Sequence, residues 1–278
     1  MSQTVPRVES PTELHELAQR LRIDILEMIA KANSGHPGGS LSAIDLITAL
    51  YYAVLRHDPK NPTWADRDRF ILSKGHACPA LYAVMGEQGY FDKALFGTLR
   101  QLGSPLQGHP ELGKLPGVEA STGSLGQGLS LGLGMAQGAR INKSPARVFV
   151  LTGDGELDEG QIWEAALYGG AHGLDNVCVI CDVNGQQLDN STEKILPLGN
   201  LADKWRSFNW HVVEIDGHDM AQILKAYQEA AATKGKPTAI IARTVKGKGV
   251  SFMENQNEWH GTAPNAEQLA TALAELKK

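Results

Sequence analysis

The sequence predicts an α/β fold, a doubly wound and mostly parallel sheet with helices on both faces. Three observations support this prediction. Apolar, β-branched runs at 147–152, 176–181, 211–215 and 238–242 are typical of parallel strands buried on both faces. Between several of these runs, apolar residues recur at helical spacing. Short segments rich in Gly, Asn and Asp punctuate the chain, as expected where strands and helices alternate.

The predicted elements begin after a short polar arm. Ser10-Pro11-Thr12-Glu13 combines an N-cap, a first-turn proline and a capping-box acid, and it predicts the start of a helix that ends near Asn33-Ser34-Gly35. A second helix is expected over 42–55, a short strand over 69–73 and a further helix over 77–88.

The middle of the chain is rich in glycine. Residues 101–123 predict an ordered loop over the sheet. Residues 126–140 predict a helix, although each glycine in a helix costs about 1 kcal/mol relative to alanine. We therefore expect very close packing, or close approach of a ligand, at Gly128, Gly132, Gly134 and Gly138. Two later helices are expected over 161–172 and 220–234.

Length and composition limit the domain organisation and the class of protein. A chain of 278 residues with no repeat and no obvious linker predicts a flexible arm over 1–10 and a single domain over 11–278. The net charge of -5 does not support a nucleic-acid surface. No apolar run is long enough to span a membrane, and the first residues lack the apolar core of a signal peptide. We expect a cytoplasmic protein.

Three cysteines cannot form a disulfide framework. Cys178 and Cys181 match a C-x-x-C pattern, but they lie within a predicted strand, where positions three apart point to opposite faces. Buried packing is therefore expected rather than a redox pair or a metal site.

Polar residues follow two neighbouring predicted strands. Gly153-Asp154-Gly155-Glu156 ends one strand, and Asp182-Val183-Asn184-Gly185 ends the next. The carboxyl ends of such strands meet at one edge of a sheet, and carboxylate, amide and carbonyl oxygens suit Mg²⁺ or Ca²⁺. The pattern predicts a metal–diphosphate site. The alternative is that Asp154 caps a helix and Asn184 forms a turn.

Three histidines follow glycine in predicted loops: His36, His76 and His109. Imidazole can hydrogen-bond phosphate or transfer protons near neutral pH. Any one of the three could instead be structural or lie at the surface. Their shared context, upstream of the metal–diphosphate candidate, favours a functional role.

The combined motifs resemble the amino-terminal domain of the transketolase family. They are Ser34-Gly-His-Pro-Gly38, Asp68-Arg-Phe-Ile-Leu-Ser-Lys-Gly-His76, Gly108-His-Pro-Glu111, Thr122-Gly-Ser-Leu-Gly-Gln-Gly128, Gly153-Asp-Gly155 and Asp182-x-Asn184. This resemblance implies a thiamine diphosphate-binding fold of the diphosphate type. The implied cofactors are thiamine diphosphate and Mg²⁺, with Ca²⁺ or Mn²⁺ as possible replacements.

The resemblance also implies roles for individual residues. Metal ligands would be Asp154, Asn184 and the backbone carbonyl of Gln186. Catalytic histidines would be His36, His76, His109 and, as a weaker match open to a structural reading, His260. Cofactor contacts would come from His76, Gly123, Ser124, Leu125, Gly153, Asp154, Gly155, Glu156 and Asn184. Glu159 and Glu164 match family acids at the subunit interface, although they could form a solvated helix face.

The carboxyl-terminal segment departs somewhat from the family pattern. Lys246 and Lys248 could attract phosphate there, or they could form an exposed basic turn.

Full-length members of the family carry a second domain, which binds the aminopyrimidine, and a smaller third one, for which this sequence has no segment. We therefore expect the amino-terminal subunit of a split transketolase. It would transfer a two-carbon ketol unit from a ketose phosphate to an aldose phosphate, in a heterotetramer with a separate carboxy-terminal subunit.

Three alternatives remain. Deoxyxylulose-phosphate synthase is a neighbouring class, against which Gly35-His36-Pro37-Gly38 argues. A split ketolase or synthase could act on another sugar phosphate. A non-catalytic thiamine diphosphate-binding or regulatory subunit would bind cofactor without turnover.

Overall fold

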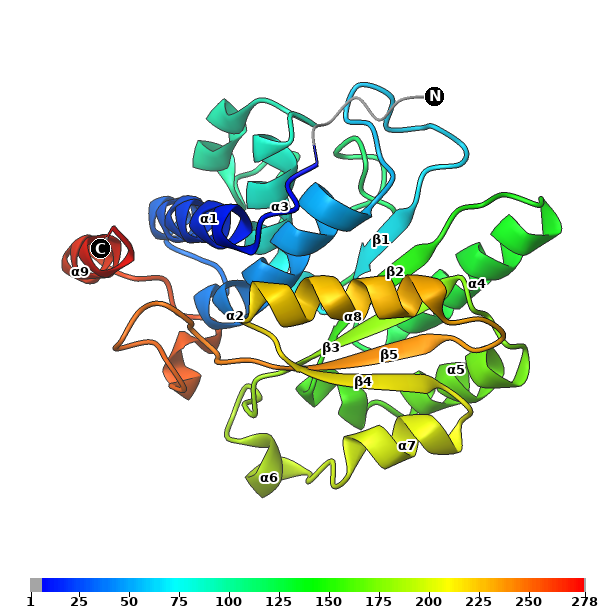
Figure 1. The fold of residues 1–278 in the computed structure, drawn as a ribbon. Helices are drawn as coiled ribbons and strands as arrows, with labels where there is room; N and C mark the ends of the chain where they lie inside the picture. The colour runs from blue at the N-terminus through cyan, green and yellow to red at the C-terminus, as the bar shows by residue number, and fades with distance from the viewer. Residues whose placement is uncertain (1–6, 278) are drawn as a thin grey trace.

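The computed structural model describes residues 7–277, which contain one five-stranded sheet with helices on both faces (Figure 1). All strand pairs are parallel, in the order β1-β2-β3-β5-β4. The predicted α/β fold is confirmed, and each predicted strand is present. The strands are β1 Arg69–Leu72, β2 Val148–Gly153, β3 Val177–Val183, β4 His211–Asp216 and β5 Thr238–Arg243.

The strand order determines which helices cover each face. Crossovers between parallel strands are right-handed, so the helices that lead into the next strand of an advancing connection lie on one face and those of a returning connection lie on the other. The helices α4, α5 and α7 lead into β2, β3 and β4, whereas α8 lies on the return from β4 to β5. The connection from β1 to β2 also contains α3, which packs with α1 and α2 on the same face as α8. Figure 1 shows α8 on the same side as α1 and α2, with α5 and α7 on the opposite side. The bounds are α1 Pro11–Ala32, α2 Pro37–Ala49, α3 Cys78–Glu87, α4 Gln127–Ile141, α5 Gly160–Ala171, α7 Leu201–Ser207 and α8 Met220–Ala232.

Alternating strand residues divide the interior into two cores. Phe149 and Cys178 belong to the core beneath α1, α2, α3 and α8, whereas Val150 and Cys181 belong to the core beneath α4, α5 and α7. The two cysteines therefore face opposite sides of β3, as expected. Both thiols are free and buried, and burial raises the pKa of each to about 12. They pack as small apolar groups.

The amino-terminal segment agrees in part with its prediction. The Ser10 side chain caps α1 by accepting a hydrogen bond from the Glu13 backbone N–H at 3.4 Å. Residues 1–6 of the predicted flexible arm lie outside the described residues. Within the remainder of the arm, the Val8 backbone N–H donates to the Tyr52 carbonyl at 3.0 Å, so this segment contacts the domain.

The prediction for the second helix was wrong at its start. The helix begins at Pro37 rather than at residue 42, and a π-helical segment, Leu50–Val54, continues it. A Cβ atom at Gly38 would meet the Trp259 carbonyl and the Lys246 side chain, so tertiary contacts explain the glycine in this first turn. Three further helices were not predicted: α6 Thr192–Ile195, α7 and α9 Ala266–Leu276.

The glycines of α4 have two different surroundings. A Cβ at Gly128 would clash with Ser73, and one at Gly132 would clash with Val150, which confirms the close packing expected there. A Cβ at Gly134 or Gly138 would instead meet no other part of the described chain within 4 Å. Half of these glycines thus serve packing on the sheet, and half lie on an open face.

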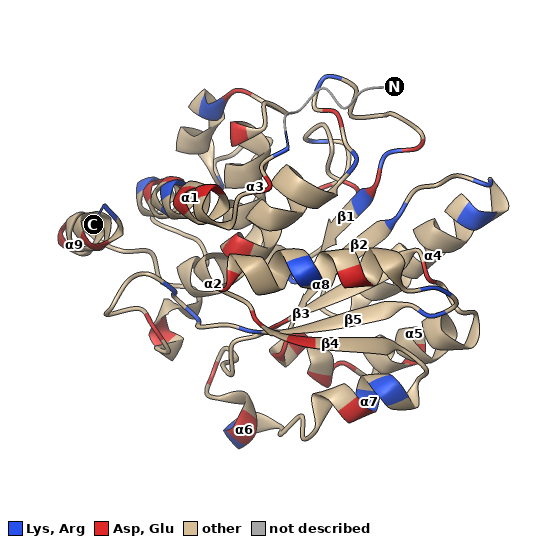
Figure 2. Ribbon diagram, viewed as in Figure 1, with Lys and Arg blue, Asp and Glu red and all other residues tan. Residues whose placement is uncertain are grey.

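Charged residues are distributed over the helices of the domain. Figure 2 shows acidic and basic residues interspersed in this view rather than separated into two faces. Among the residues that the structure describes, no helix combines the length and apolar character needed to cross a membrane.

Candidate active site

A cavity of about 290 Å³ lies at the carboxyl edge of the sheet. It collects residues from the segments that follow β1, β2, β3 and β5, because the carboxyl ends of parallel strands open to the same edge. The lining residues are His36, Gly39, Lys74, His76, His109, Gly123, Leu125, Gly153, Asp154, Gly155, Glu156, Asn184, Gln186, Gln187, Leu188, Lys246 and His260. Most of them are residues that the sequence predicted for the site.

Close backbone contacts hold the loops together. His76 lies in a 3-10 turn, Gly75–Ala77, directly after β1 and Lys74. A Cβ at Gly75 would meet Thr122 and the Gly123 backbone, and one at Gly123 would meet the His109 ring. Gly123 also has a φ of 136°, a conformation that L side chains rarely adopt. Glycine at these two positions therefore lets His76 and His109 approach each other.

Asp154 occupies the position after β2 and is 2% exposed. Its Oδ1 accepts from the Gly155 backbone N–H at 2.9 Å, and its Oδ2 accepts from the Gly185 N–H at 2.6 Å. Burial and the negative charge of Asp182 raise the pKa of Asp154 to about 7. The carboxylate thus lies in a place that favours a compensating positive charge.

The other two predicted metal ligands, Asn184 and Gln186, lie in the loop after β3. Asn184 and Gln186 line the cavity with Asp154, and the Asn184 side-chain oxygen accepts from the Gln186 N–H at 3.1 Å. The described residues contain no cluster of three or more His, Cys, Asp or Glu side chains placed to hold a metal ion. The predicted set has a different composition, with one carboxylate, one amide and one backbone carbonyl, which are the hard oxygen donors that Mg²⁺ accepts. These residues fit such an ion.

Glu156 joins three segments beneath the cavity. Its Oε1 accepts from the Gly126 N–H at 2.9 Å and from the Ser73 hydroxyl, and its Oε2 accepts from the Gly153 N–H at 3.1 Å. The side chain is 2% exposed, and burial raises its pKa. The carboxyl group ties the loop that contains Gly123 to the end of β2.

Four histidines form a cluster in the cavity. The His36 ring lies 5.1 Å from His76, 6.4 Å from His109 and 5.5 Å from His260, measured between ring centroids. The His76 and His260 rings are also 5.1 Å apart. The structure therefore brings all four predicted histidines together, including His260.

Burial and nearby positive charges lower the pKa of each of these histidines, which favours the neutral imidazole. Burial and the Arg100 charge lower the pKa of His36 to about 4, and burial and Lys246 lower that of His260 to about 3. The pKa of His76 falls well below its usual value through burial and Lys74, and burial and Arg100 lower that of His109. A neutral imidazole offers one donor and one acceptor, which suits hydroxyl groups and proton transfer.

Basic neighbours fix which ring nitrogen carries the proton. The Arg100 Nη2 lies 3.4 Å from His36 Nδ1, and the Lys246 Nζ lies 3.0 Å from His260 Nδ1. Guanidinium and ammonium groups only donate, so both Nδ1 atoms accept and the proton resides on Nε2. Each ring then has its Nε2–H available as a donor.

A buried ion pair supports the floor of the cavity. Lys74 forms an ion pair with Asp182, which also accepts from the Ser42 hydroxyl at 2.6 Å and from the Thr244 hydroxyl. These residues come from α2, from the segment after β1, from β3 and from the segment after β5. The network joins the ends of three strands.

Lys246 is buried rather than part of an exposed basic turn. Its Nζ donates to the Gln187 carbonyl at 2.8 Å, and burial and Lys74 lower its pKa to about 8. Lys248, by contrast, pairs with Glu254 at 3.6 Å and is partly exposed. Only the first lysine of this pair lines the cavity.

A second buried network holds the chain on both sides of Lys246. Asp45 accepts from Arg22 at 3.0 and 2.5 Å and from His218 Nδ1 at 2.7 Å. His218 Nε2 then accepts from the Val245 N–H at 2.9 Å, and Arg22 Nε donates to the Lys248 carbonyl at 3.2 Å. The Asp45 carboxylate thus acts through Arg22 and His218 to position Lys246.

Three predicted residues lie outside the cavity lining. Ser124 is exposed in the loop before α4, Glu159 is exposed at the N-cap of α5, and Glu164 is exposed on α5. Among the residues that sequence analysis did not place in the site are Lys74, Arg100 and Gln187. Lys74 had a detectable signal, since it directly follows a predicted strand, but nothing in the pattern distinguished Arg100.

Residues 14–276 match the family model described as the transketolase, thiamine diphosphate binding domain. The chain belongs to the transketolase family. The cavity therefore lies within a thiamine diphosphate-binding domain, in agreement with the resemblance of the motifs.

Two relatives of similar length carry the names of transketolase subunits. The chain is 43% identical over 270 residues to the 6-deoxy-6-sulfo-D-fructose transketolase subunit SqwG of Clostridium sp. (strain MSTE9), covering 97% of this chain and 98% of the relative. It is 41% identical over 261 residues to an apulose-4-phosphate transketolase subunit of Phocaeicola vulgatus, covering 94% and 92% of the two chains.

Solved transketolases have the same fold in a longer chain. The Campylobacter jejuni enzyme superimposes with a TM-score of 0.91 at 35% identity, covering 96% of this chain and 43% of that one. The Leishmania mexicana enzyme gives a TM-score of 0.89 at 32% identity, covering 98% and 42%. This transketolase-family chain spans less than half the length of those structures.

Proposed function

We propose that the chain is the amino-terminal subunit of a split, thiamine diphosphate-dependent transketolase. The observation that carries this proposal is the cavity itself, which is lined both by the buried Asp154 carboxylate, whose pKa is raised, and by four clustered histidines. The lengths and names of its subunit-sized relatives support a separate partner chain.

The loops after β2 and β3 would hold the diphosphate through a divalent cation. Asp154, Asn184 and the Gln186 carbonyl would be its protein ligands, with Mg²⁺ the expected ion and Ca²⁺ or Mn²⁺ as replacements. Glycine at 153 and 155 avoids close contacts with the cavity lining, because a Cβ would lie 3.3 Å from the Lys74 side chain at Gly153 and 3.0 Å from the Gln187 side chain at Gly155. The remaining cofactor contacts would come from two other segments. These are the loop residues Gly123, Ser124 and Leu125, and Glu156 after β2.

The histidines would act on the sugars. When bound, thiamine diphosphate supplies the carbon that carries the two-carbon unit between donor and acceptor. His36 and His260 present Nε2–H donors to sugar oxygens, and neutral His76 and His109 can accept or return hydroxyl protons at pH 7. These contacts would hold the ketose phosphate in one orientation while protons move between its hydroxyl oxygens and the histidine nitrogens.

An open groove on α4 and α5 is a candidate subunit interface. Gly134, Gly138, Ile141 and Tyr168 line it together with Glu164, and Ile141 is 71% exposed. Small residues allow close helix approach, and exposed apolar side chains gain from burial. We propose that this face, with Glu159 and Glu164, contacts another subunit in a heterotetramer, and that the assembly is cytoplasmic.

The substrate is proposed as a ketose phosphate donor and an aldose phosphate acceptor. Lys246, with its pKa lowered to about 8 by burial and Lys74, remains largely charged at pH 7 and favours an anionic ligand. Two relatives are named for 6-deoxy-6-sulfo-D-fructose and for apulose 4-phosphate, and these two sugars extend the set to be tested.

Reconstitution tests the function. With Mg²⁺ and thiamine diphosphate, we expect ketol transfer from xylulose 5-phosphate to ribose 5-phosphate only when the chain is mixed with its carboxy-terminal partner, the product of the adjacent reading frame. The proposal places the pyrimidine-binding half in the partner, so we expect the chain alone to be inactive. The measurement is product formation, with light scattering to determine the mass of the mixed assembly.

The outcomes separate the alternatives. Activity of the chain alone would contradict the split-subunit proposal. Cofactor binding without turnover of xylulose 5-phosphate, 6-deoxy-6-sulfo-D-fructose or apulose 4-phosphate in the mixture would instead favour a non-catalytic role.

His109→Ala should reduce kcat of the reconstituted enzyme by about 100-fold or more, since a positioned acid or base contributes about that much. Thiamine diphosphate affinity should change little. Exposed His15 on α1 supplies the matched control, and His15→Ala should leave kcat unchanged. Loss of folding in His109→Ala, seen as a large fall in Tm, would instead indicate a structural role for this histidine.

A further inference from the structure

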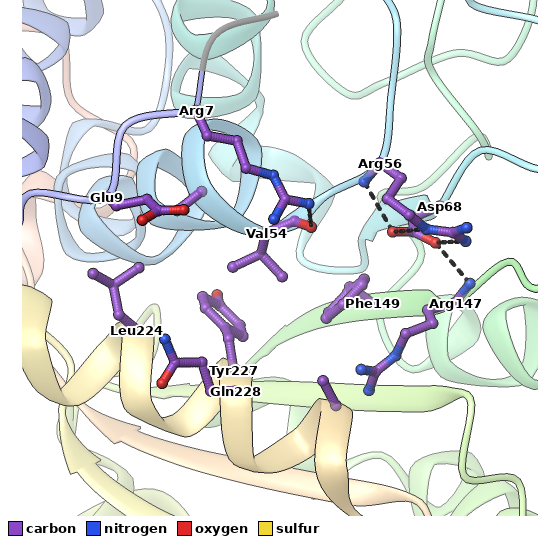
Figure 3. A pocket seen from close by; sticks show the side chains of 12 residues that line it. Arg7, Glu9, Val54, Arg56, Asp68, Arg147, Phe149, Leu224, Tyr227 and Gln228 are labelled. Carbon is purple, nitrogen blue, oxygen red and sulfur yellow. Dashed lines mark hydrogen bonds and ion pairs between the residues drawn. The ribbon is translucent and has the colours of Figure 1, made fainter. Parts of the chain in front are cut away.

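A second cavity, of about 440 Å³, is shown in Figure 3. It lies at the amino-terminal edge of the sheet, opposite the active site. Asp68 and Arg147, which immediately precede β1 and β2, lie on its wall. Val54, Leu224, Tyr227 and Phe149 supply apolar surface. Its volume falls within the range of about 300–1,000 Å³ that is typical of small-molecule sites.

The charges in this cavity do not balance. Arg56 pairs with Asp68 at 2.7 Å, and the two Asp68 oxygens also accept from the Arg56 and Arg147 backbone N–H groups, both at 2.9 Å. Asp68 is therefore fully occupied. Within residues 7–277, neither Arg7 nor Arg147 forms an ion pair with a carboxylate; each donates one hydrogen bond to a backbone carbonyl. Glu9 is the remaining acidic residue of the lining.

Arg147 is held in place before any ligand arrives. Its Nη2 donates to the Ala230 carbonyl at 2.8 Å, and its guanidinium carbon lies 5.4 Å from the centroid of the Phe149 ring. A guanidinium group has five N–H donors, so most of the donors of Arg147 are unused by the protein. A fixed arginine without a carboxylate partner is suited to phosphate, which accepts several such bonds.

The polar groups lie on two sides of the cavity. Figure 3 shows Arg147 and Arg56 on one side, Glu9 and Gln228 on the other, and Arg7 between them. The arginine side matches an anionic group, and a carboxylate with an amide can accept and donate hydrogen bonds to hydroxyls. We propose that this cavity binds a small polyol phosphomonoester, with the phosphate on Arg7 and Arg147 and the hydroxyls toward Glu9 and Gln228.

This inference does not depend on the proposed function, because binding is measured on the chain alone without thiamine diphosphate or partner. Isothermal titration with ribitol 5-phosphate, inorganic phosphate and ribitol supplies the test. Ribitol 5-phosphate has no carbonyl group and cannot enter ketol transfer. We expect it to bind, inorganic phosphate to bind more weakly and ribitol to give no heat.

Variants assign the binding to this cavity. Arg147→Gln should raise Kd for ribitol 5-phosphate by about tenfold or more, the usual effect of losing a charge-assisted contact. Arg7→Gln, which changes an exposed side chain, gives a second measurement if Arg147→Gln does not fold. Arg206→Gln removes the same charge from an exposed position on α7 and should leave Kd unchanged.

Three results would overturn the proposal. The first is no binding of ribitol 5-phosphate to the wild-type chain. The second is an unchanged Kd in both Arg147→Gln and Arg7→Gln. The third is loss of binding in His109→Asn, which would place the ligand in the active-site cavity instead.

Discussion

Asp154→Ala should abolish Mg²⁺-dependent binding of thiamine diphosphate while the chain stays folded. Asp154 is the one carboxylate in the proposed ligand set, and losing even residues behind a metal ligand costs about 10–100-fold in affinity. We therefore expect a loss of about 100-fold or more, measured by titration of thiamine diphosphate at fixed Mg²⁺. Burial of the Asp154 carboxylate opposes its ionisation, so we expect the alanine variant to stay folded. The loss of affinity is then a loss of the metal site and not of the fold.

The matched control is Asp189→Ala. Asp189 is exposed in the segment that follows Asn184, and its carboxylate lies outside the cavity lining. This variant should keep wild-type affinity. Normal Mg²⁺-dependent affinity in Asp154→Ala would mean that the metal is held elsewhere.

Of the variants proposed, Asp45→Ala should lower the free energy of unfolding most. It would leave the Arg22 guanidinium, 2% exposed, without its carboxylate partner. Breaking one side of a buried ion pair typically destabilises by about 3–5 kcal/mol. We expect the free energy of unfolding, measured in urea, to fall by that amount, and the segment around Lys246 to lose its two anchors.

Two controls test the physical reason. Asp203→Ala breaks the exposed pair with Arg206 on α7 and should change the free energy of unfolding by less than about 1 kcal/mol. Replacing both buried charges, Arg22→Met with Asp45→Leu, should destabilise less than Asp45→Ala alone. Equal stability of Asp45→Ala and wild type would contradict the assignment.

The Asp45 carboxylate also makes the free energy of unfolding depend on pH. Burial opposes ionisation, but the Arg22 charge and the hydrogen bonds from His218 and Arg22 prevail and lower the pKa of Asp45 to about 2. Because the folded-state pKa lies below the ordinary value of 3.8, the unfolded chain binds the proton more readily. The contribution of Asp45 is complete above about pH 4 and is lost as the pH falls toward 2. Urea unfolding measured across this range checks the expectation.

The strands were predictable because their sequence signal is local. The apolar runs of β1, β2, β3 and β5 are almost entirely buried. Such runs need cover on both faces, which a parallel sheet between two layers of helices provides. The start of α2 was not predictable in this way, since Pro37, Gly38 and Gly39 suggest a loop and the close contacts of Gly38 with Trp259 and Lys246 are long-range. α9 was missed despite a usable signal, the capping box of Asn265 and Gln268.

The site was predictable where residue type and strand ends coincide. Asp154, Asn184 and His76 each follow a strand, and their position in the sheet brings them to one cavity. Arg100 and Lys246 enter from loops whose path depends on long-range contacts, with Ser34 for Arg100 and with His218 for Val245. No spacing in the sequence encodes those contacts.

The network of Ser42, Lys74, Asp182 and Thr244 has an evolutionary consequence. It completes the floor of the active site with residues of one chain, so a mutation in another subunit cannot disturb it directly. Substitutions in a partner chain can therefore accumulate without direct loss of these contacts.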